Sequence, residues 1–297
     1  MMRVAHAYEP SLRSKPVSKG MNDMNGFTSS VALLNDVPLR TWEGGEGPTL
    51  LFLHGAGGAA DFFVDGQPAP FLAELAQSFR VLVTEHPGFG ANERPAWLAT
   101  MHDLAYFYLD YLQARSLRNV HLVGHSLGGW LALELAVRNT EHLASLTVAG
   151  AAGVDVLGVP KGDIFLWSRD DFARNMFRTP AAAQAYLART MTPEQERIAA
   201  RNRETFMLLA SEPRLFDPHL HKWLHRISVP AHIIWAEDDA VLPRPYGEAI
   251  AGLIGNARLT ILDGAGHLMQ IDQPSAFGAA VSGFIRQSAA TTRNQPA

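Results

Sequence analysis

The sequence predicts an α/β fold in which helices flank a mostly parallel sheet. Short apolar runs that end at glycine-containing turns alternate with segments of helical period along most of the chain. Residues 153–228 interrupt this alternation with helical segments alone. Because a chain of 297 residues with 47% hydrophobic residues can bury one large core, we interpret the interruption as an insertion within a single domain.

The predicted strands are short runs rich in Val, Leu and Ile. The first two are expected to form an antiparallel pair, and a glycine-rich turn at residues 44–47 leads into the first buried strand. The runs lie at residues 31–34, 39–42, 49–53, 80–84, 120–123, 146–149, 232–235 and 259–262.

Helical segments are predicted between these strands, at residues 71–77, 102–114, 127–137, 244–254 and 276–286. Within residues 153–228, Pro160, Pro180, Pro193 and Pro213 divide the chain into about four short helices, because proline begins or ends helices far more readily than it sits inside them. The predicted organisation is a flexible leader (1–26), a core (27–152 and 229–290) and an inserted helical cap (153–228).

Composition excludes several classes of function. The net charge is −4 and no run rich in Lys or Arg occurs, which argues against nucleic-acid or anionic-membrane partners and favours a small-molecule substrate. The absence of cysteine excludes disulfides, thiolate zinc sites and cysteine nucleophiles. The N-terminal residues lack the apolar run of a signal peptide, and no apolar stretch approaches the roughly 20 residues that span a bilayer, so a cytoplasmic location is expected.

A Gly-x-Ser-x-Gly motif stands where a predicted strand passes directly into a predicted helix, which is the context that this motif requires. Its serine, Ser126, is the predicted nucleophile. Gly124 and Gly128 permit the tight turn because they bring no Cβ into it. The N–H of Leu127 lies at a helix N-terminus, where it can stabilise an oxyanion.

Five motifs, taken in their order along residues 31–286, resemble those of the α/β-hydrolase fold family. This resemblance implies a mostly parallel eight-stranded sheet, a helical cap inserted after the sixth strand and a substrate pocket between cap and core. The motifs are His54-Gly55-Ala56-Gly57-Gly58, His86-Pro87-Gly88-Phe89-Gly90, Gly124-His125-Ser126-Leu127-Gly128-Gly129, Trp235-Ala236-Glu237-Asp238-Asp239 and Gly264-Ala265-Gly266-His267.

A serine nucleophile needs a base and a carboxylate that orients the base, and the order in this family is serine, acid, histidine. His267 follows the last predicted strand in a glycine-rich loop and is the predicted base. Asp239 is the predicted acid, because the usual pattern of the family places the acid four residues before a proline, here Pro243. The adjacent Asp238 remains the alternative. By resemblance, the N–H of Ala56 is the second oxyanion donor.

Other histidines receive weaker assignments. By resemblance, His54 and His125 flank the site in structural roles, and His86 is left without one. No metal or other cofactor is expected, since no acidic or cysteine partner is placed to complete a site with four other histidines, His219, His221, His225 and His232. The predicted pocket residues are Phe62, Phe63, Trp130 and Trp167.

These residues predict a serine hydrolase that cleaves a carboxylic ester of a small to medium, largely apolar substrate through an acyl-enzyme. One alternative is hydrolysis of carbon–carbon bonds in vinylogous diketones, although Gly58-Ala59-Ala60 stands where such relatives commonly carry Pro-Gly. Cofactor-free haloperoxidase activity would use the same residues. A receptor-like protein that uses the pocket only for binding is the non-enzymatic alternative.

Overall fold

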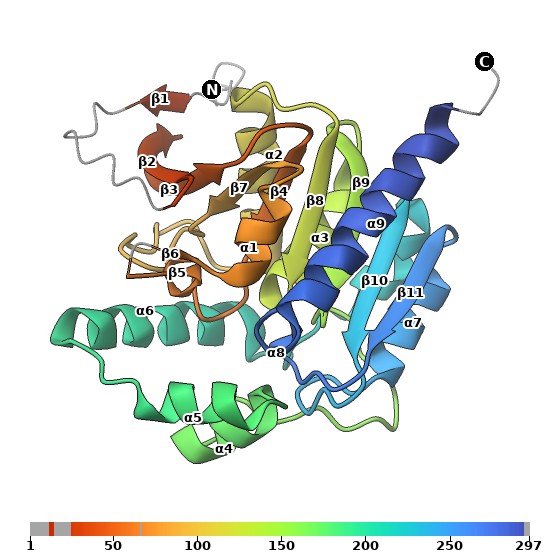
Figure 1. The fold of residues 1–297 in the computed structure, drawn as a ribbon. Helices are drawn as coiled ribbons and strands as arrows, with labels where there is room; N and C mark the ends of the chain where they lie inside the picture. Colours follow the sequence, from red (N-terminus) through yellow and green to blue (C-terminus); the bar gives the residue numbers. More distant parts are fainter. Residues whose placement is uncertain (1–11, 15–24, 66, 294–297) are drawn as a thin grey trace, which may run out of the picture.

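The computed structural model describes residues 12–14, 25–65 and 67–293. In these residues the strands form a nine-stranded sheet in the order β1-β2-β3-β7-β4-β8-β9-β10-β11, parallel from β7 to β11 (Figure 1). The predicted fold class, with its mostly parallel sheet, is confirmed. The strands are β1 (Leu12–Ser14), β2 (Phe27–Leu34), β3 (Val37–Gly44), β4 (Thr49–Leu53), β7 (Arg80–Thr84), β8 (Val120–His125), β9 (Leu143–Ala149), β10 (Ala231–Ala236) and β11 (Ala257–Leu262).

Eight of these strands contain the predicted runs, and β1 is additional. It pairs antiparallel with β2, inside the stretch predicted to be a flexible leader. Apart from Asn25 and Gly26, the rest of that stretch lies outside the described residues. A small second sheet of β5 (Phe63–Val64) and β6 (Gln67–Pro68) was also not predicted, because two-residue strands carry no periodic signal.

Helices cover both faces of the sheet (Figure 1). Successive side chains of a strand point to opposite faces of the sheet, so the core consists of two clusters, one on each face. Leu51 and Leu53 belong to the cluster with α2, α3 and α7, whereas Leu50 and Phe52 belong to the cluster with α1 and α9. The helices outside residues 153–228 are α1 (Pro70–Leu75), α2 (Met101–Ala114), α3 (Leu127–Arg138), α7 (Pro245–Leu253), α8 (Met269–Asp272) and α9 (Pro274–Arg293), with a 3₁₀ turn, η1 (Ala60–Phe62).

Three helices and two 3₁₀ turns occupy the described segment between β9 and β10, where about four short helices were predicted. Pro180 and Pro193 are the first residues of α5 and α6, as proline's fixed φ favours. Figure 1 shows α4, α5 and α6 beyond the end of the sheet towards which β8 and β10 point. The elements are α4 (Arg169–Met176), α5 (Pro180–Ala188), α6 (Pro193–Ala210), η2 (Leu220–Lys222) and η3 (Leu224–Arg226).

None of the helices in the described residues combines the length and the apolar character that crossing a membrane would require.

Candidate active site

Ser126 is the single residue between β8 and α3. Its φ of +57° lies in a region that residues with a Cβ rarely adopt, at a cost of about 1–3 kcal/mol. The turn is held by the Ser126 N–H, which donates to Ala149 O at 2.9 Å. A Cβ on Gly128 would come within 2.1 Å of Leu53 O, so only glycine lets α3 approach β4 this closely.

The structure brings Ser126, His267 and Asp239 together from three separate loops at the ends of β8, β11 and β10. His267 Nδ1 lies 2.8 Å from Asp239 Oδ2, and His267 Nε2 lies 2.9 Å from Ser126 Oγ. Because the carboxylate accepts the Nδ1 proton, Nε2 is left to accept the serine proton. The histidine and aspartate side chains are at most 1% exposed, so the hydrogen bond between them is shielded from water.

Asp239, and not Asp238, faces His267. The second oxygen of Asp239 accepts from the backbone N–H groups of Val241 and Leu242, both at 2.9 Å, which fixes the carboxylate. Asp238 is half exposed and pairs with Arg178 at 2.8 Å.

The loop after β4 lies directly against Ser126. A Cβ on Gly55 would be 3.2 Å from Ser126 Cβ. His54 Nδ1 donates to Gly55 O at 2.6 Å, and because the peptide unit is planar and trans, this bond also fixes the direction of the Ala56 N–H on its opposite side. Leu127 is the first residue of α3, ahead of the first intrahelical bond from Trp130 N to Ser126 O.

The three histidines near the site are buried in defined tautomers. Burial lowers the pKa of His54 to about 4 and that of His125 to about 3, and it holds the pKa of His86 well below its usual value. His125 Nε2 donates to His267 O at 2.8 Å and so helps to place the loop that carries His267. His86, for which the sequence suggested no role, donates from Nε2 to His54 O at 3.1 Å and accepts from Tyr108.

Glu85, at the end of β7, was missed by the sequence analysis. Its Oε1 accepts the N–H of Ala59 at 2.7 Å, which anchors the far end of the loop after β4. Burial raises the pKa of this carboxyl to about 7, chiefly because the charged form is desolvated. A charged residue that directly follows a buried strand was the available signal.

The structure places the rings of two predicted pocket residues, Phe62 and Phe63, against aromatic side chains of the sheet. Phe62 packs edge-on against Phe52, within the core, and Phe63 stacks on Trp42 with ring centroids 4.9 Å apart. Phe62 is buried and Phe63 is partly buried in the apolar packing beside β4 and β3, and both stay predictions as pocket residues. Trp130, which donates to Glu134, and Trp167 stay predictions as pocket residues.

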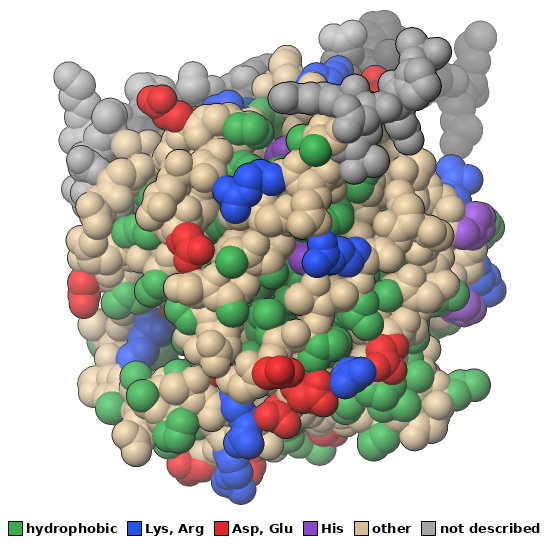
Figure 2. All heavy atoms as spheres, turned by 45° about the vertical axis from the view of Figure 1, so that its right-hand side comes forward, with side chains coloured by type: hydrophobic (Ala, Val, Ile, Leu, Met, Phe, Trp, Pro, Cys, Tyr) green, Lys and Arg blue, Asp and Glu red, His purple; other side chains and the backbone are tan. Residues whose placement is uncertain are grey.

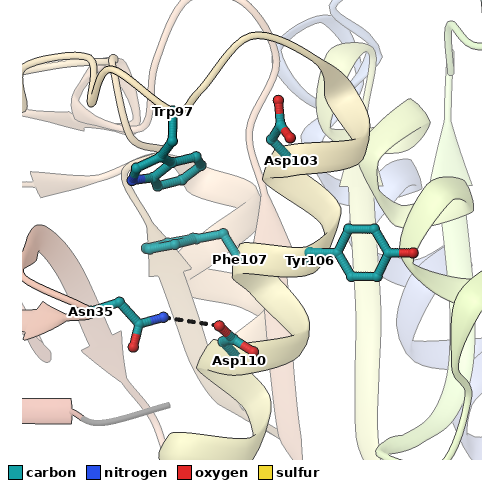
Figure 3. Close-up of a pocket in the computed structure, with 6 residues that line it drawn as sticks. All are labelled: Asn35, Trp97, Asp103, Tyr106, Phe107 and Asp110. Carbon is teal, nitrogen blue, oxygen red and sulfur yellow. Dashed lines mark hydrogen bonds between the residues drawn. The ribbon is translucent and has the colours of Figure 1, made fainter. Parts of the chain in front are cut away.

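A surface hollow of about 340 Å³ lies along α2, away from the predicted catalytic residues (Figure 3). The rings of Trp97 and Phe107 stack there, with centroids 5.7 Å apart, while Asn35 donates to Asp110 at 2.9 Å. The polar groups at its base are thus paired with one another.

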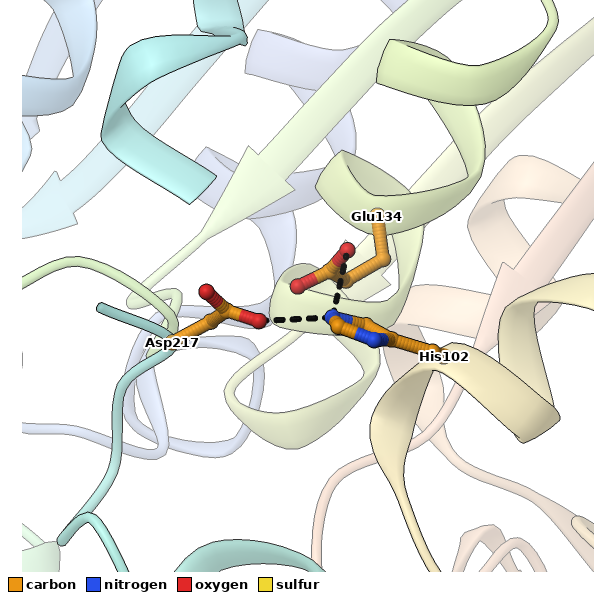
Figure 4. Close-up of side chains that lie close together, drawn as sticks. All are labelled: His102, Glu134 and Asp217. Atoms are coloured by element: carbon orange, nitrogen blue, oxygen red, sulfur yellow. Dashed lines mark hydrogen bonds and ion pairs between the residues drawn. The ribbon is translucent and has the colours of Figure 1, made fainter. Parts of the chain in front are cut away.

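One group of potential metal ligands occurs among the described residues: His102, Glu134 and Asp217 (Figure 4). His102 Nε2 lies 2.6 Å from Asp217 and 3.7 Å from Glu134. Arg138 already compensates the charge of Glu134. We therefore interpret the group as an ion-pair network that joins α2, α3 and the segment after α6. Of the four histidines considered for a metal site, His232 lies 2.9 Å from Thr260 Oγ1.

The comparison with known families accounts for this arrangement. The sequence model of the family described as the alpha/beta hydrolase fold matches residues 48–274. The chain belongs to the alpha/beta hydrolase fold family. The match begins just before β4 and ends at the start of α9, so it contains Ser126, Asp239 and His267.

Individual members of this family resemble the chain at lower levels. It is 26% identical to a 2-hydroxymuconate semialdehyde hydrolase of Pseudomonas sp., covering 83% of this chain and 89% of that protein. It is 29% identical to a putative carbamate hydrolase, RutD, of Stutzerimonas stutzeri, covering 78% of this chain and 89% of that protein. A solved bacterial membrane phospholipase A shares the fold, with a TM-score of 0.74 at 23% identity over 93% of this chain and 89% of that one.

The face of this alpha/beta hydrolase that is turned forward in Figure 2 carries both acidic and basic side chains, interspersed with hydrophobic ones. The named relatives are hydrolases, so hydrolysis of a small molecule is the class of function that the comparisons support.

Proposed function

We propose that the protein is a serine hydrolase that cleaves a carboxylic ester through an acyl-enzyme. The observation that carries the proposal is the unbroken path from Ser126 Oγ through His267 to Asp239, with steps of 2.9 and 2.8 Å. Such a path lets a weak nucleophile lose its proton as it attacks.

In the proposed mechanism Ser126 Oγ forms a bond to the ester carbonyl carbon while His267 Nε2 takes its proton. The Ala56 and Leu127 N–H groups receive the negative charge that develops on the carbonyl oxygen. The tetrahedral intermediate then collapses, the alcohol leaves with the proton from His267, and Ser126 carries the acyl group. Water, activated by the same histidine, attacks the acyl-enzyme and releases the acid.

We further propose that residues 153–228 act as a cap whose inner side lines an apolar pocket. The partly buried Trp167 and the buried Phe165 and Phe206 bring aromatic surface to this segment. A small to medium substrate with an uncharged acyl part suits such surroundings, since binding sites are mostly apolar with a few placed polar groups.

A second candidate is hydrolysis of a carbon–carbon bond, which is favoured by the relatives. Besides the semialdehyde hydrolase, a 2-hydroxy-6-oxononadienedioate hydrolase of Paraburkholderia phymatum is 27% identical over 91% of this chain. Such a reaction would use the same Ser126 site. Against it stands the loop sequence Gly58-Ala59-Ala60.

The test is a panel of 4-nitrophenyl esters of graded acyl length beside a vinylogous diketone, assayed with the wild type and Ser126→Ala. We expect fast release of 4-nitrophenol that Ser126→Ala loses. Faster turnover of the diketone would replace the ester by the carbon–carbon candidate. Stoichiometric binding of these compounds without turnover would instead favour a receptor.

A further inference from the structure

Hydrogen bonds join helix α6 to the loop after β4, which lies against Ser126, and to the loop after β7. On the inner face of α6, Asn202 is 5% exposed and Thr205 is 2% exposed, so both are buried at positions that a helix normally gives to apolar residues. Buried polar groups of this kind are retained where they make hydrogen bonds. Here every one of these bonds goes to backbone.

Asn202 uses both ends of its carboxamide. Its Nδ2 donates to Gly57 O at 2.7 Å, in the loop after β4, and its Oδ1 accepts from Gly90 N at 2.8 Å, in the loop after β7. These partners lie 145 and 112 residues away in the sequence. One side chain of α6 therefore holds two loops of the core in a fixed relation.

The bond to Gly57 O holds the loop two peptide units beyond the one that carries the Ala56 N–H. Ala56, the proposed oxyanion donor, lies between Gly55, which abuts Ser126, and Gly57, which Asn202 holds. The carboxamide also packs so closely on Gly58 that a Cβ there would be 2.8 Å from Asn202 Nδ2. Glu85 anchors the far end of the same loop through Ala59 N. The loop is thus fixed at three points along five residues.

We propose that Asn202 is a positioning residue for the oxyanion hole. Through its hydrogen bond to Gly57 O, it couples the position of the Ala56 N–H to the position of α6. The inference rests on the proposed function, since it takes Ala56 as a donor to the transition state. Its consequence is that a substrate or partner that displaces α6 changes the rate of acyl transfer, and not only the affinity for substrate. A displacement of about 1 Å in a catalytic group can change a rate about 100-fold.

The test compares Asn202→Ala and Asn202→Asp with Thr205→Val. In Asn202→Asp the side chain keeps the acceptor for Gly90 N but, when ionised, cannot donate to Gly57 O. Thr205→Val is the matched control: Thr205 Oγ1 donates from the same helix to Gly88 O at 2.7 Å, in the loop after β7, and not to the loop that carries Ala56. Near-UV circular dichroism shows which variants keep the native packing.

Two rates are measured on each variant. The first is hydrolysis of 4-nitrophenyl butyrate, as kcat and KM separately. The second is labelling by a fluorophosphonate, in which Ser126 Oγ bonds to phosphorus, fluoride leaves, His267 takes the proton, and the phosphoryl oxygen occupies the oxyanion hole. Labelling reports on the hole even if the wild type hydrolyses no ester, so failure of the proposed function is distinguishable from failure of this inference.

Both Asn202 variants are expected to lose about 10- to 100-fold in kcat and in the labelling rate, with KM within about threefold of wild type. Thr205→Val is expected to stay within about twofold in both rates. The inference is overturned if Asn202→Asp labels at the wild-type rate, or if Thr205→Val loses as much as the Asn202 variants, because docking of α6 in general would then be responsible. If Asn202→Ala does not fold, Asn202→Asp, which keeps the volume of the side chain, decides alone.

Discussion

At the scale of single residues, two adjacent aspartates have opposite surroundings. Asp239 accepts three hydrogen bonds from buried donors, one of them His267 Nδ1. Asp238 is half exposed and pairs with an exposed arginine, a contact that contributes about 0–1 kcal/mol at most. One position in the sequence separates a proposed catalytic group from a surface group.

This contrast predicts that Asp239→Asn lowers kcat by about 10⁴-fold, because an amide at that position stabilises the wrong tautomer of His267 and no longer compensates its charge. Steady-state hydrolysis of a nitrophenyl ester measures the loss. Asp238→Asn is the matched control and should stay within a few-fold of wild type. If the two variants exchange these results, the assignment of the acid is wrong.

At the scale of elements, the residues that follow β8, β4 and β7 each position one part of the proposed site. The tight exit from β8 presents Ser126, the loop after β4 presents Ala56, and Glu85 at the end of β7 holds that loop. Glu85 is a carboxyl buried beside a backbone donor, and its pKa is raised to about 7. Burial therefore favours the protonated form of this carboxyl in the folded protein, although its oxygen accepts the Ala59 N–H in either form.

The sign of that dependence follows from the proton balance. In the unfolded chain the carboxyl titrates near 4.5, and in the folded protein near 7, so between these pH values the folded state holds a proton that the unfolded state has lost. Stability from this group is complete below the unfolded pKa and is lost as the pH rises through the folded one. His54 and His125, whose folded pKa values are lowered, act in the opposite direction.

Glu85→Gln removes the titration but keeps an acceptor for Ala59 N. We expect the free energy of unfolding of the wild type, relative to Glu85→Gln, to fall by on the order of 3 kcal/mol from about pH 4.5 to about pH 7. Urea unfolding of both proteins across this range measures the difference, in which the histidine contributions cancel. A difference independent of pH would show that Glu85 has no raised pKa.

At the scale of the whole molecule, the segment between β9 and β10 is tied to both sides of the site. Asn202 connects α6 to the loop of Ala56. On the other side, Asp272 accepts the N–H groups of Arg178 and Thr179, between α4 and α5, and that of Gly266 next to His267, at 2.8 to 2.9 Å. The proposed cap and the loops that carry Ala56 and His267 thus share hydrogen bonds.

Asp272→Asn replaces one acceptor by a donor that faces backbone N–H groups. We expect the free energy of unfolding to fall by about 1–3 kcal/mol, and kcat to fall with it as the loop of His267 loosens. Urea unfolding and ester hydrolysis measure the two effects. Asp238→Asn, which breaks only the exposed pair with Arg178, should change stability by less than about 1 kcal/mol. Equal effects of the two substitutions would contradict the role of Asp272.

The sequence by itself determined eight strands of the large sheet, five of the helices around it and the order of the proposed catalytic residues. Strands β4 and β7 begin and end where the apolar runs do, because period, turn glycines and proline positions act within a few residues. Ser126, Asp239 and His267 stand in a fixed order relative to strand ends, and parallel strands bring those ends to one edge.

Only the tertiary structure decided which polar groups hold the loops of the proposed site in place. Glu85, Asn202 and Asp272 bond to backbone 26, 145 and 94 residues away, and no local pattern encodes such pairs. Likewise, the sequence placed Phe62 and Phe63 near the pocket by proximity alone, and only the structure shows that Phe62 packs against Phe52 and that Phe63 stacks on Trp42. Burial and hydrogen-bond satisfaction are properties of the assembled chain, and they fix what proximity in sequence leaves open.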